Sequence, residues 1–396
     1  MNILIADKLA DVTVEQLEAL GATVSMQPDL GADDLSKALG DSEVLVVRST
    51  KVTQAAIEAA SSLSLIIRAG AGVNTIDLEC ASRHGIYVTN CPGKNTAAVA
   101  ELVIGLIIAA DRNIVNAAQD LRNGKWRKKH YSSLSQGLKG RTLGIIGLGS
   151  IGKAVARRAQ GLEMQVAAWS RSLTPETAEA LGIEYIDSAQ KVAETCDVVS
   201  VHLASTPKTA HFIDEDFLSH IKDGAIFINT SRGEVVDTAA LKQAMKTKGL
   251  RVGLDVYENE PAAGDSAFEA TDMAQAVTGT PHIGASTREA AQAIADEVVN
   301  IVNAYRYTGT PINVVNLQKQ STAVNKLVVR HYNKVGVLAG VLDELRGANI
   351  NIEEMQNIIF DGGRAASCTL QLDDSVSPEL IRKLADMEHI IQIAKA

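Results

Sequence analysis

The chain has 396 residues, which is too long for one ordinary hydrophobic core and predicts two or three domains. Its formal net charge of -9 argues against nucleic acid or an anionic membrane as the partner. Four cysteines without metal-type spacing, and an amino terminus without a signal-peptide pattern, lead us to expect a cytoplasmic protein with buried thiols and no bound metal.

Short apolar segments alternate with amphipathic stretches over the first 95 residues. This alternation is typical of a parallel α/β unit. It predicts a flavodoxin-like first lobe over residues 1–95. The expected strands are residues 3–6, 44–47, 65–68 and 87–89, with an amphipathic helix at 54–61.

A long helical pattern over residues 97–122 and a basic loop at 125–131 lead to the sequence TLGIIGLGSIG at 142–152. There an apolar strand runs into three glycines with the GxGxxG spacing of a dinucleotide-binding turn. Gly147 would make the tight turn, Gly149 would let the backbone approach a pyrophosphate, and Gly152 would allow close helix packing. The following helix would direct its amino-terminal amides at the anion.

A second α/β series follows these glycines and predicts a Rossmann-type domain over residues 96–285, inserted in the first lobe. Its expected strands after 143–146 are residues 165–169, 198–202, 225–229, 253–256 and 276–278. A helix over 287–307 would then carry the chain back. The first lobe would therefore comprise residues 1–95 and 286–316, with a hinge near residues 96 and 286.

The last part of the chain has a different pattern. Residues 317–325 form an expected linker, and residues 326–396 follow the order strand, helix, strand, strand, helix, strand. This order predicts a small α+β domain of the βαββαβ type.

Three polar residues follow apolar strands of the second series, where ligands bind in open α/β sheets. They are Arg232 in INTSRGEVVD, Glu260 in LDVYENEP and His282 in TPHIGAST. Hydride transfer at a 2-hydroxy acid needs a fixed cation, a proton acceptor and a carboxylate that holds the acceptor. Arg232 would bind the substrate carboxylate, His282 would exchange the hydroxyl proton, and Glu260 would hold the imidazole.

These motifs, in this order after GxGxxG, resemble the D-isomer-specific 2-hydroxyacid dehydrogenase family over about residues 1–316. The resemblance implies an NAD-dependent oxidoreductase in which Arg232, Glu260 and His282 are catalytic. The expected cofactor contacts are Gly147, Gly149, Ser150, Ile151, Gly152, Ser170, Arg171, His202, Thr206, Thr230, Ser231, Arg232, Asp255, His282 and Gly284.

The first lobe carries the expected substrate contacts. VVRSTKVT at 46–53 and IIRAGAGVNTID at 66–77 resemble the substrate-binding loops of family members that act on a phosphorylated acid. The resemblance implies that Arg48, Ser49, Gly72 and Val73 lie near the substrate carboxylate, and that Arg68 contacts a phosphate.

The sequence is less specific about the part of the site that would bind the adenosine ribose of the cofactor. An NAD site normally has an acidic residue at the end of the second strand, where this chain has Ser170. The adjacent Arg171 could neutralise the 2'-phosphate of NADP. We expect NAD, which this part of the family mostly uses, with NADP as the alternative.

Residues 327–356 resemble the ACT regulatory domain, which implies homodimers or homotetramers. The resemblance also implies a serine effector bound by His331, Asn333 and Asn351 between paired subunits. The alternative is an oligomerisation module without an effector.

Three functions remain open. The first is a serine-regulated dehydrogenase of a small phosphorylated 2-hydroxy acid. The second is another 2-hydroxyacid dehydrogenase that reduces glyoxylate or hydroxypyruvate, possibly with NADP. The third is a nucleotide-sensing binding protein without catalytic activity.

Overall fold

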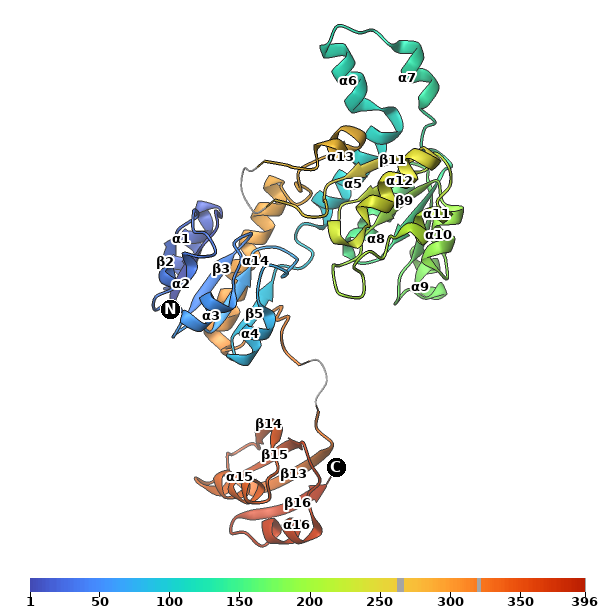
Figure 1. The fold of residues 1–396 in the computed structure, drawn as a ribbon. Helices are drawn as coiled ribbons and strands as arrows, with labels where there is room; N and C mark the ends of the chain where they lie inside the picture. The colour runs from blue at the N-terminus through green and yellow to red at the C-terminus, as the bar shows by residue number, and fades with distance from the viewer. Residues whose placement is uncertain (262–266, 319–321, 396) are drawn as a thin grey trace. The chain divides into compact units, whose positions relative to one another are not determined.

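A computed structural model describes residues 1–261, 267–318 and 322–395. The chain divides into two compact units, Met1–Asn316 and Leu317–Ala396. The first unit contains two parallel sheets and the second contains one antiparallel sheet (Figure 1).

The first sheet has the parallel strand order β2-β1-β3-β4-β5, which is the order of flavodoxin-like folds. Its strands are β1 (Asn2–Ile5), β2 (Thr23–Met26), β3 (Val44–Val47), β4 (Leu65–Arg68) and β5 (Tyr87–Asn90). The intervening helices are α1 (Asp11–Ala19), α2 (Leu35–Ala38), α3 (Gln54–Ala59) and α4 (Leu78–Arg83). Alternate strand residues enter two cores, one on each face, which is why the central strands are apolar throughout.

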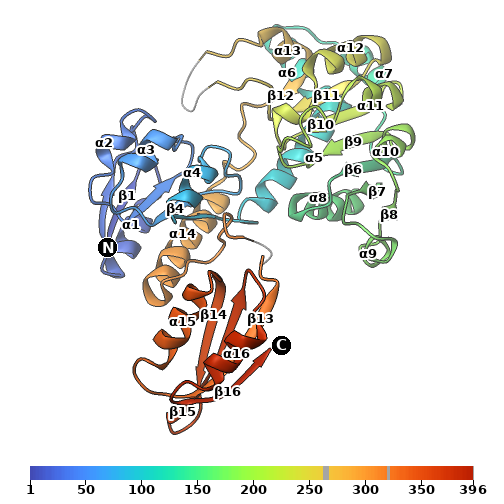
Figure 2. The same ribbon diagram turned by 60° about the horizontal axis from the view of Figure 1, so that its bottom comes forward.

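Helix α14 (Arg288–Thr308) completes one of these two cores (Figures 1 and 2). Its residues Ile294, Val298 and Ile301 pack in the same cluster as Ile3 and Ile5 of β1. The chain beyond α14 then pairs antiparallel with β5 through a bridge between Val314 and Thr89. The first lobe is therefore built from two separate stretches of sequence.

The second sheet has the parallel order β12-β11-β10-β9-β6-β7-β8. Numbered from β6, this is the Rossmann order 3-2-1-4-5-6 with one further strand, so the predicted Rossmann-type fold is confirmed. Its strands are β6 (Thr142–Ile146), β7 (Gln165–Trp169), β8 (Glu184–Tyr185), β9 (Val198–Val201), β10 (Ile226–Asn229), β11 (Arg251–Leu254) and β12 (Thr278–Gly279).

Helices cover both faces of this sheet. Residues of α5 (Thr96–Arg112), α8 (Ser150–Gly161) and α9 (Pro175–Ala180) enter one core. Residues of α10 (Ala189–Thr195), α11 (Glu215–His220), α12 (Thr238–Lys248) and α13 (Thr271–Ala276) enter the other.

Three local expectations were wrong. The helical pattern over 97–122 is broken at Asn113, whose left-handed backbone (φ 51°, ψ 40°) separates α5 from α6 (Ile114–Arg122). Asparagine tolerates this conformation better than most residues. Part of the expected basic loop is instead helix α7 (Lys128–Leu134), and the strand expected at 276–278 begins only at Thr278, because Ala276 is the last residue of α13.

Helices α6 and α7 extend together beyond the second sheet (Figure 1) and bury none of their residues. Their base is fixed by Asp111, which is completely buried. The Asp111 carboxylate accepts hydrogen bonds from the Gly137 N–H at 2.9 Å, Arg141 at 3.0 Å and Arg251 at 3.3 Å. This network joins the end of α5 to the residue before β6 and to the first residue of β11.

The second unit has the order β13 (Asn325–Tyr332), α15 (Val337–Gly347), β14 (Ile352–Ile359), β15 (Ala365–Leu372), α16 (Pro378–Ala385) and β16 (Ile390–Lys395). Its antiparallel sheet has the strand order β14-β15-β13-β16. Among the described residues, no helix combines the length and apolar character needed to cross a membrane. All four cysteines are buried and free, as expected.

Candidate active site

The turn after β6 has an open side next to the first residues of α8, Ser150 and Ile151. Gly147 has a φ of 95°, and a Cβ added at Gly152 would be 2.5 Å from the Gly147 carbonyl oxygen, so neither position accommodates a side chain without strain. A Cβ at Gly149 would meet no atom within 4 Å. The turn therefore fits a pyrophosphate placed against the backbone amides at the start of α8.

The end of β7 holds no acidic side chain. Ser170 and the exposed Arg171 follow Trp169, whose ring stacks on Phe212 with centroids 5.4 Å apart. The chain therefore has Ser170 where an NAD site commonly has a carboxylate, and a cation at the next position.

Two expected cofactor contacts, His202 and Thr230, come directly after β9 and β10. The ring of His202 forms a hydrogen bond with Ser200 at 2.9 Å, and burial lowers the pKa of His202 to about 4. Its imidazole is therefore neutral at pH 7. The hydroxyl of Thr230 is buried without a hydrogen-bond partner among the described residues, which suits it to contact a bound ligand. Thr206 is exposed, and its N–H donates to Thr209 at 2.8 Å.

Arg232 lies in a turn that Asn229 holds in place. The Asn229 side-chain oxygen accepts hydrogen bonds from the N–H and hydroxyl of Ser231 at 2.9 Å and 2.8 Å. Its amide nitrogen donates to the Arg232 carbonyl at 2.8 Å. Because Asn229 is the buried last residue of β10, the position of Arg232 is tied to the sheet.

His282 and Glu260 form a direct pair, with Nδ1 and Oε2 2.7 Å apart. Glu260 also accepts the N–H of Tyr257 at 3.0 Å. Burial raises the pKa of Glu260, but the hydrogen bond and charge of His282 and the charge of Arg232 outweigh burial and lower it below its ordinary value. Because Nδ1 faces Glu260, Nε2 is the ring nitrogen positioned to exchange a proton with a substrate.

Asp255 holds the loop that carries His282. Its buried carboxylate accepts hydrogen bonds from the Thr280 hydroxyl at 2.6 Å and from the N–H groups of Ile283 and Gly284, each at 2.8 Å. Its carbonyl accepts the N–H of His282 at 2.8 Å. Burial raises the pKa of Asp255. Asp255 and Gly284, expected at the cofactor, thus have a defined role in loop geometry.

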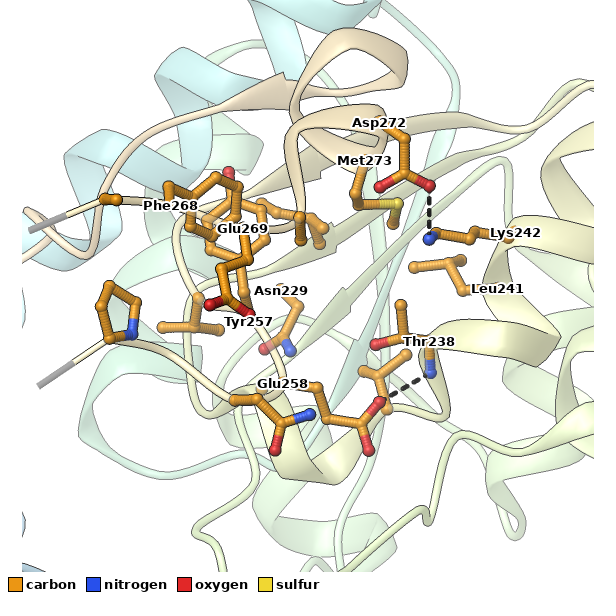
Figure 3. Close-up of a pocket in the computed structure, with 18 residues that line it drawn as sticks. Asn229, Thr238, Leu241, Lys242, Tyr257, Glu258, Phe268, Glu269, Asp272 and Met273 are labelled. Atoms are coloured by element: carbon orange, nitrogen blue, oxygen red, sulfur yellow. Dashed lines mark hydrogen bonds and ion pairs between the residues drawn. The ribbon is translucent and has the colours of Figure 1, made fainter.

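Glu258 lines a separate cavity of about 540 Å³, which is shown in Figure 3. Its carboxylate accepts the Thr238 N–H at 3.1 Å and pairs with His211 at 2.6 Å. Glu260, and not Glu258, is therefore the carboxylate paired with His282.

A larger cavity, of about 790 Å³, brings the first lobe and the second sheet together within the first unit. Arg48, Ser49 and Arg68 line it from the first lobe, whereas Glu260 and His282 line it from the second sheet. The two groups come from distant parts of the sequence, since their nearest members, Arg68 and Glu260, are 192 positions apart. The structure therefore unites most of the expected substrate contacts with the expected acid-base pair.

The cationic side chains of this region form no direct ion pair within the described residues. Burial, together with the charges of Arg232 and Arg48, lowers the pKa of Arg68 to about 10. The Nε of Arg68 is buried without a partner, and none of the ion pairs within the described residues includes Arg48, Arg68 or Arg232. A Cβ added at Gly72 would be 2.2 Å from Arg232 Nη2, so the backbone of this loop, which continues into Val73, contacts the guanidinium. Such a cluster favours an anionic ligand.

Sequence reasoning missed Asp7. Its carboxylate accepts hydrogen bonds from the backbone N–H of Arg48 at 2.7 Å, and from those of Ser49 and Thr50, each at 3.1 Å. The available signal was a charged residue directly after a buried strand, which is the same signal that identified Arg232.

The residues expected to bind an effector are not together in one chain. His331 is buried and pairs with Asn357 at 3.4 Å, and Asn333 donates to the Gly363 carbonyl at 3.0 Å. His331 lies opposite Ala366 on β15, whereas Asn351 precedes Ile352, which lies opposite Leu372. Six residues of strand correspond to about 20 Å, so Asn351 lies at the opposite end of the sheet.

Residues 104–284 match the family model described as "D-isomer specific 2-hydroxyacid dehydrogenase, NAD binding domain". D-3-phosphoglycerate dehydrogenase of Methanocaldococcus jannaschii is 38% identical over 80% of this chain and 60% of its own length. Hydroxypyruvate reductase of Thermotoga maritima is 41% identical over 68% of this chain and 87% of its own length.

A solved structure has a similar fold. It is the NADPH-dependent glyoxylate/hydroxypyruvate reductase of Sinorhizobium meliloti in complex with NADP and malonate. It is 30% identical, with a TM-score of 0.67 over 79% of this chain and 96% of its own. The present chain thus matches these reductases over nearly their whole length, but it spans only about 60% of the phosphoglycerate dehydrogenase.

Proposed function

Because this chain belongs to the D-isomer-specific 2-hydroxyacid dehydrogenase family, we propose that it is a D-3-phosphoglycerate dehydrogenase. It would oxidise 3-phosphoglycerate to 3-phosphohydroxypyruvate with NAD, in the first step of L-serine biosynthesis. The observation that carries this proposal is the crowded cluster of arginines beside the His282–Glu260 pair, in which burial and the charges of Arg232 and Arg48 lower the pKa of Arg68.

The charge of the substrate matches this cluster. A phosphorylated 2-hydroxy acid carries a carboxylate and a phosphate, which together require several cationic donors. Arg232 would bind the carboxylate through its planar fork, and Arg68 would bind the phosphate. A substrate without phosphate would leave the partly buried Arg68 guanidinium, whose Nε has no partner, without an anion, which is costly.

His282 is the proposed acid-base residue. It would accept the hydroxyl proton of the substrate as the C2–H bond breaks and the C2–O bond becomes a carbonyl. Glu260 would stabilise the resulting imidazolium across their 2.7 Å contact. When bound, NAD accepts the hydride that leaves C2. Arg232 would polarise the developing carbonyl.

The residues of the nucleotide turn would hold NAD. The amides at the start of α8 would contact the pyrophosphate beside Gly149, and the buried Thr230 hydroxyl offers a further donor or acceptor. Because Arg171 could pair with a 2'-phosphate, the protein would also use NADP, but less well than NAD.

A second candidate is a glyoxylate or hydroxypyruvate reductase. The Ser170 and Arg171 pair favours it, because a cation at this position suits NADP. The two reductases compared above support it, since the chain aligns with almost their full length. A nucleotide-sensing binding protein is the least favoured candidate, because it would not need the His282–Glu260 pair.

We also propose that the βαββαβ unit is an ACT-like regulatory domain that binds serine between two chains of a homodimer or homotetramer. The support is the element order and the polar residues His331, Asn333 and Asn351. Since Asn351 lies about 20 Å from the other two along the sheet, such a site needs a second copy.

The purified protein's reduction of 3-phosphohydroxypyruvate and of hydroxypyruvate tests the first candidate. We expect kcat/KM to be at least about 100-fold higher for the phosphorylated compound, which corresponds to about 2.7 kcal/mol. Equal values would favour the reductase, and no turnover of any 2-oxo acid would favour the binding protein.

A further inference from the structure

Three successive backbone amides converge on one carboxylate at the edge of the first sheet. The N–H groups of Arg48, Ser49 and Thr50 donate to Asp7 Oδ2 at 2.7, 3.1 and 3.1 Å, and the Ser49 hydroxyl donates to Oδ1 at 2.7 Å. Consecutive amides that point at one centre form an anion-binding nest. Here the chain supplies the anion from its own side chain.

The sheet topology brings the two segments together. Asp7 follows β1, and residues 48–50 follow β3, which pairs in parallel with β1. Their carboxyl ends therefore meet at one edge of the sheet. The Ala6 N–H donates to the Val46 carbonyl at 2.9 Å, which continues the pairing up to the nest.

The nest lies at the wall of the larger cavity. Arg48 and Ser49 line that cavity, whereas Asp7 is only 9% exposed and does not line it. Asp7 also partly offsets the crowded positive charge. Burial, Arg232 and Arg48 lower the pKa of Arg68, whereas the charges of Cys91 and Asp7 act in the opposite direction.

We propose that Asp7 is a positioning residue for the substrate: its carboxylate holds residues 48–50 so that Arg48 and Ser49 present their donors to the anionic ligand. This inference rests on the proposed function, because it assumes that the larger cavity binds a 2-hydroxy acid. Asp7 does not touch the reacting atoms. It acts only through the loop that it holds.

Loss of the Asp7 carboxylate should weaken substrate binding and leave the rate of turnover nearly unchanged. Without the carboxylate, three amides and one hydroxyl lose a charge-assisted acceptor, and the loop samples other conformations. Hydrogen bonds to charged groups contribute about 1.5–3 kcal/mol each. Their loss is therefore large enough to weaken substrate binding measurably. The pair that carries the chemistry, His282 and Glu260, lies in loops of the second sheet and remains in place.

The test compares Asp7→Ala and Asp7→Asn with the wild-type protein. We expect Asp7→Ala to raise KM for 3-phosphoglycerate by about 10-fold or more, with kcat and the Kd for NAD changed less than about twofold. Asp7→Asn, which keeps one acceptor oxygen, should have a KM between those of the wild-type protein and Asp7→Ala. Asp11→Ala, at an exposed position early in α1, is the matched control and should change none of these values.

Formate provides a second readout, since its carboxylate can occupy the empty nest. We expect it to lower the raised KM of Asp7→Ala and to give no such improvement in the wild-type protein or Asp11→Ala. A melting temperature that falls in Asp7→Ala while KM stays unchanged would overturn the proposal and leave Asp7 a purely structural role.

Amide hydrogen exchange keeps this inference distinct from the proposed function. Residues 48–50 should exchange faster in Asp7→Ala than in the wild-type protein, whatever the substrate is. Unchanged exchange would refute the positioning role. Failure of the wild-type protein to turn over any 2-oxo acid would instead refute the proposed function.

Discussion

Glu260 Oε2 lies 2.7 Å from His282 Nδ1, at the wall of the same cavity that Arg48 and Arg68 line from the other sheet. The pair thus joins a proton acceptor to an anion-binding wall built from a distant part of the chain. Several measurable consequences follow from this arrangement.

Replacing His282 by alanine should remove the acid-base group while the nucleotide turn stays intact. We expect His282→Ala to lower kcat by about 10²- to 10⁴-fold, which is the usual contribution of general acid-base catalysis. Fluorescence titration should show that NADH still binds. His211→Ala is the control, because His211 pairs with Glu258 outside this cavity. A near-normal kcat in His282→Ala would refute the assignment.

Glu260 should contribute a pH-dependent stability. Its folded-state pKa is lowered below the ordinary 4.5, so the stabilisation is complete above pH 4.5 and is lost as pH falls through the lower folded-state pKa. The difference in melting temperature between the wild-type protein and Glu260→Gln should therefore be largest near pH 7 and shrink below pH 4.5. A difference that grows toward acid pH would contradict this sign.

Arg68 should discriminate phosphorylated from unphosphorylated substrates. Arg68→Gln removes a charged donor, so we expect KM for 3-phosphohydroxypyruvate to rise about 10- to 100-fold and KM for hydroxypyruvate to change much less. Steady-state kinetics with both compounds measures this difference. Arg83→Gln, at an exposed ion pair of the same lobe, should affect neither. Equal increases for both substrates would show that Arg68 does not bind the phosphate.

Arg171 should set the residual affinity for NADP. We expect the wild-type protein to bind NADH more tightly than NADPH, and Arg171→Asp to weaken NADPH binding by about 10-fold or more with little loss for NADH. Fluorescence titration gives both dissociation constants without turnover. Lys191→Gln, another exposed cation of this domain, serves as the control. An NADPH affinity that survives in Arg171→Asp would exclude this role.

Asp111 should be important for stability. Asp111→Ala leaves Arg141 and Arg251 without their shared carboxylate, so we expect a loss of about 3–5 kcal/mol in the free energy of unfolding. Urea denaturation followed by circular dichroism measures this loss. Asp187→Ala, at an exposed ion pair of the same domain, should have little effect. Similar stabilities of the two variants would contradict the expected cost of breaking the buried network.

The parts of the site that were predictable depend on local patterns. Arg232 and His282 each lie three residues beyond the end of a strand, and parallel strands place such residues at one edge of a sheet. The glycines of the turn were identified because their spacing has a direct backbone consequence. These signals need no knowledge of which strands are neighbours.

Other features depend on contacts between distant segments. The role of Asp7 follows from the pairing of β1 with β3, which the sequence order of the strands does not reveal. Strand β2 was not predicted. It lies at the sheet edge and alternates between exposed and half-buried residues, so its hydrophobic pattern is weak. The break at Asn113 depends on one backbone conformation within an otherwise continuous helical pattern.

The split first lobe constrains the order in which the protein can fold during synthesis. One core of the amino-terminal sheet needs Ile294, Val298 and Ile301, which leave the ribosome long after the strands they cover. Domains usually fold from the amino terminus onward, but here the second sheet has all its strands by Gly279 and can close first. Proteolysis of nascent chains stalled before residue 290 should therefore cleave the first 95 residues in preference to the nucleotide-binding domain.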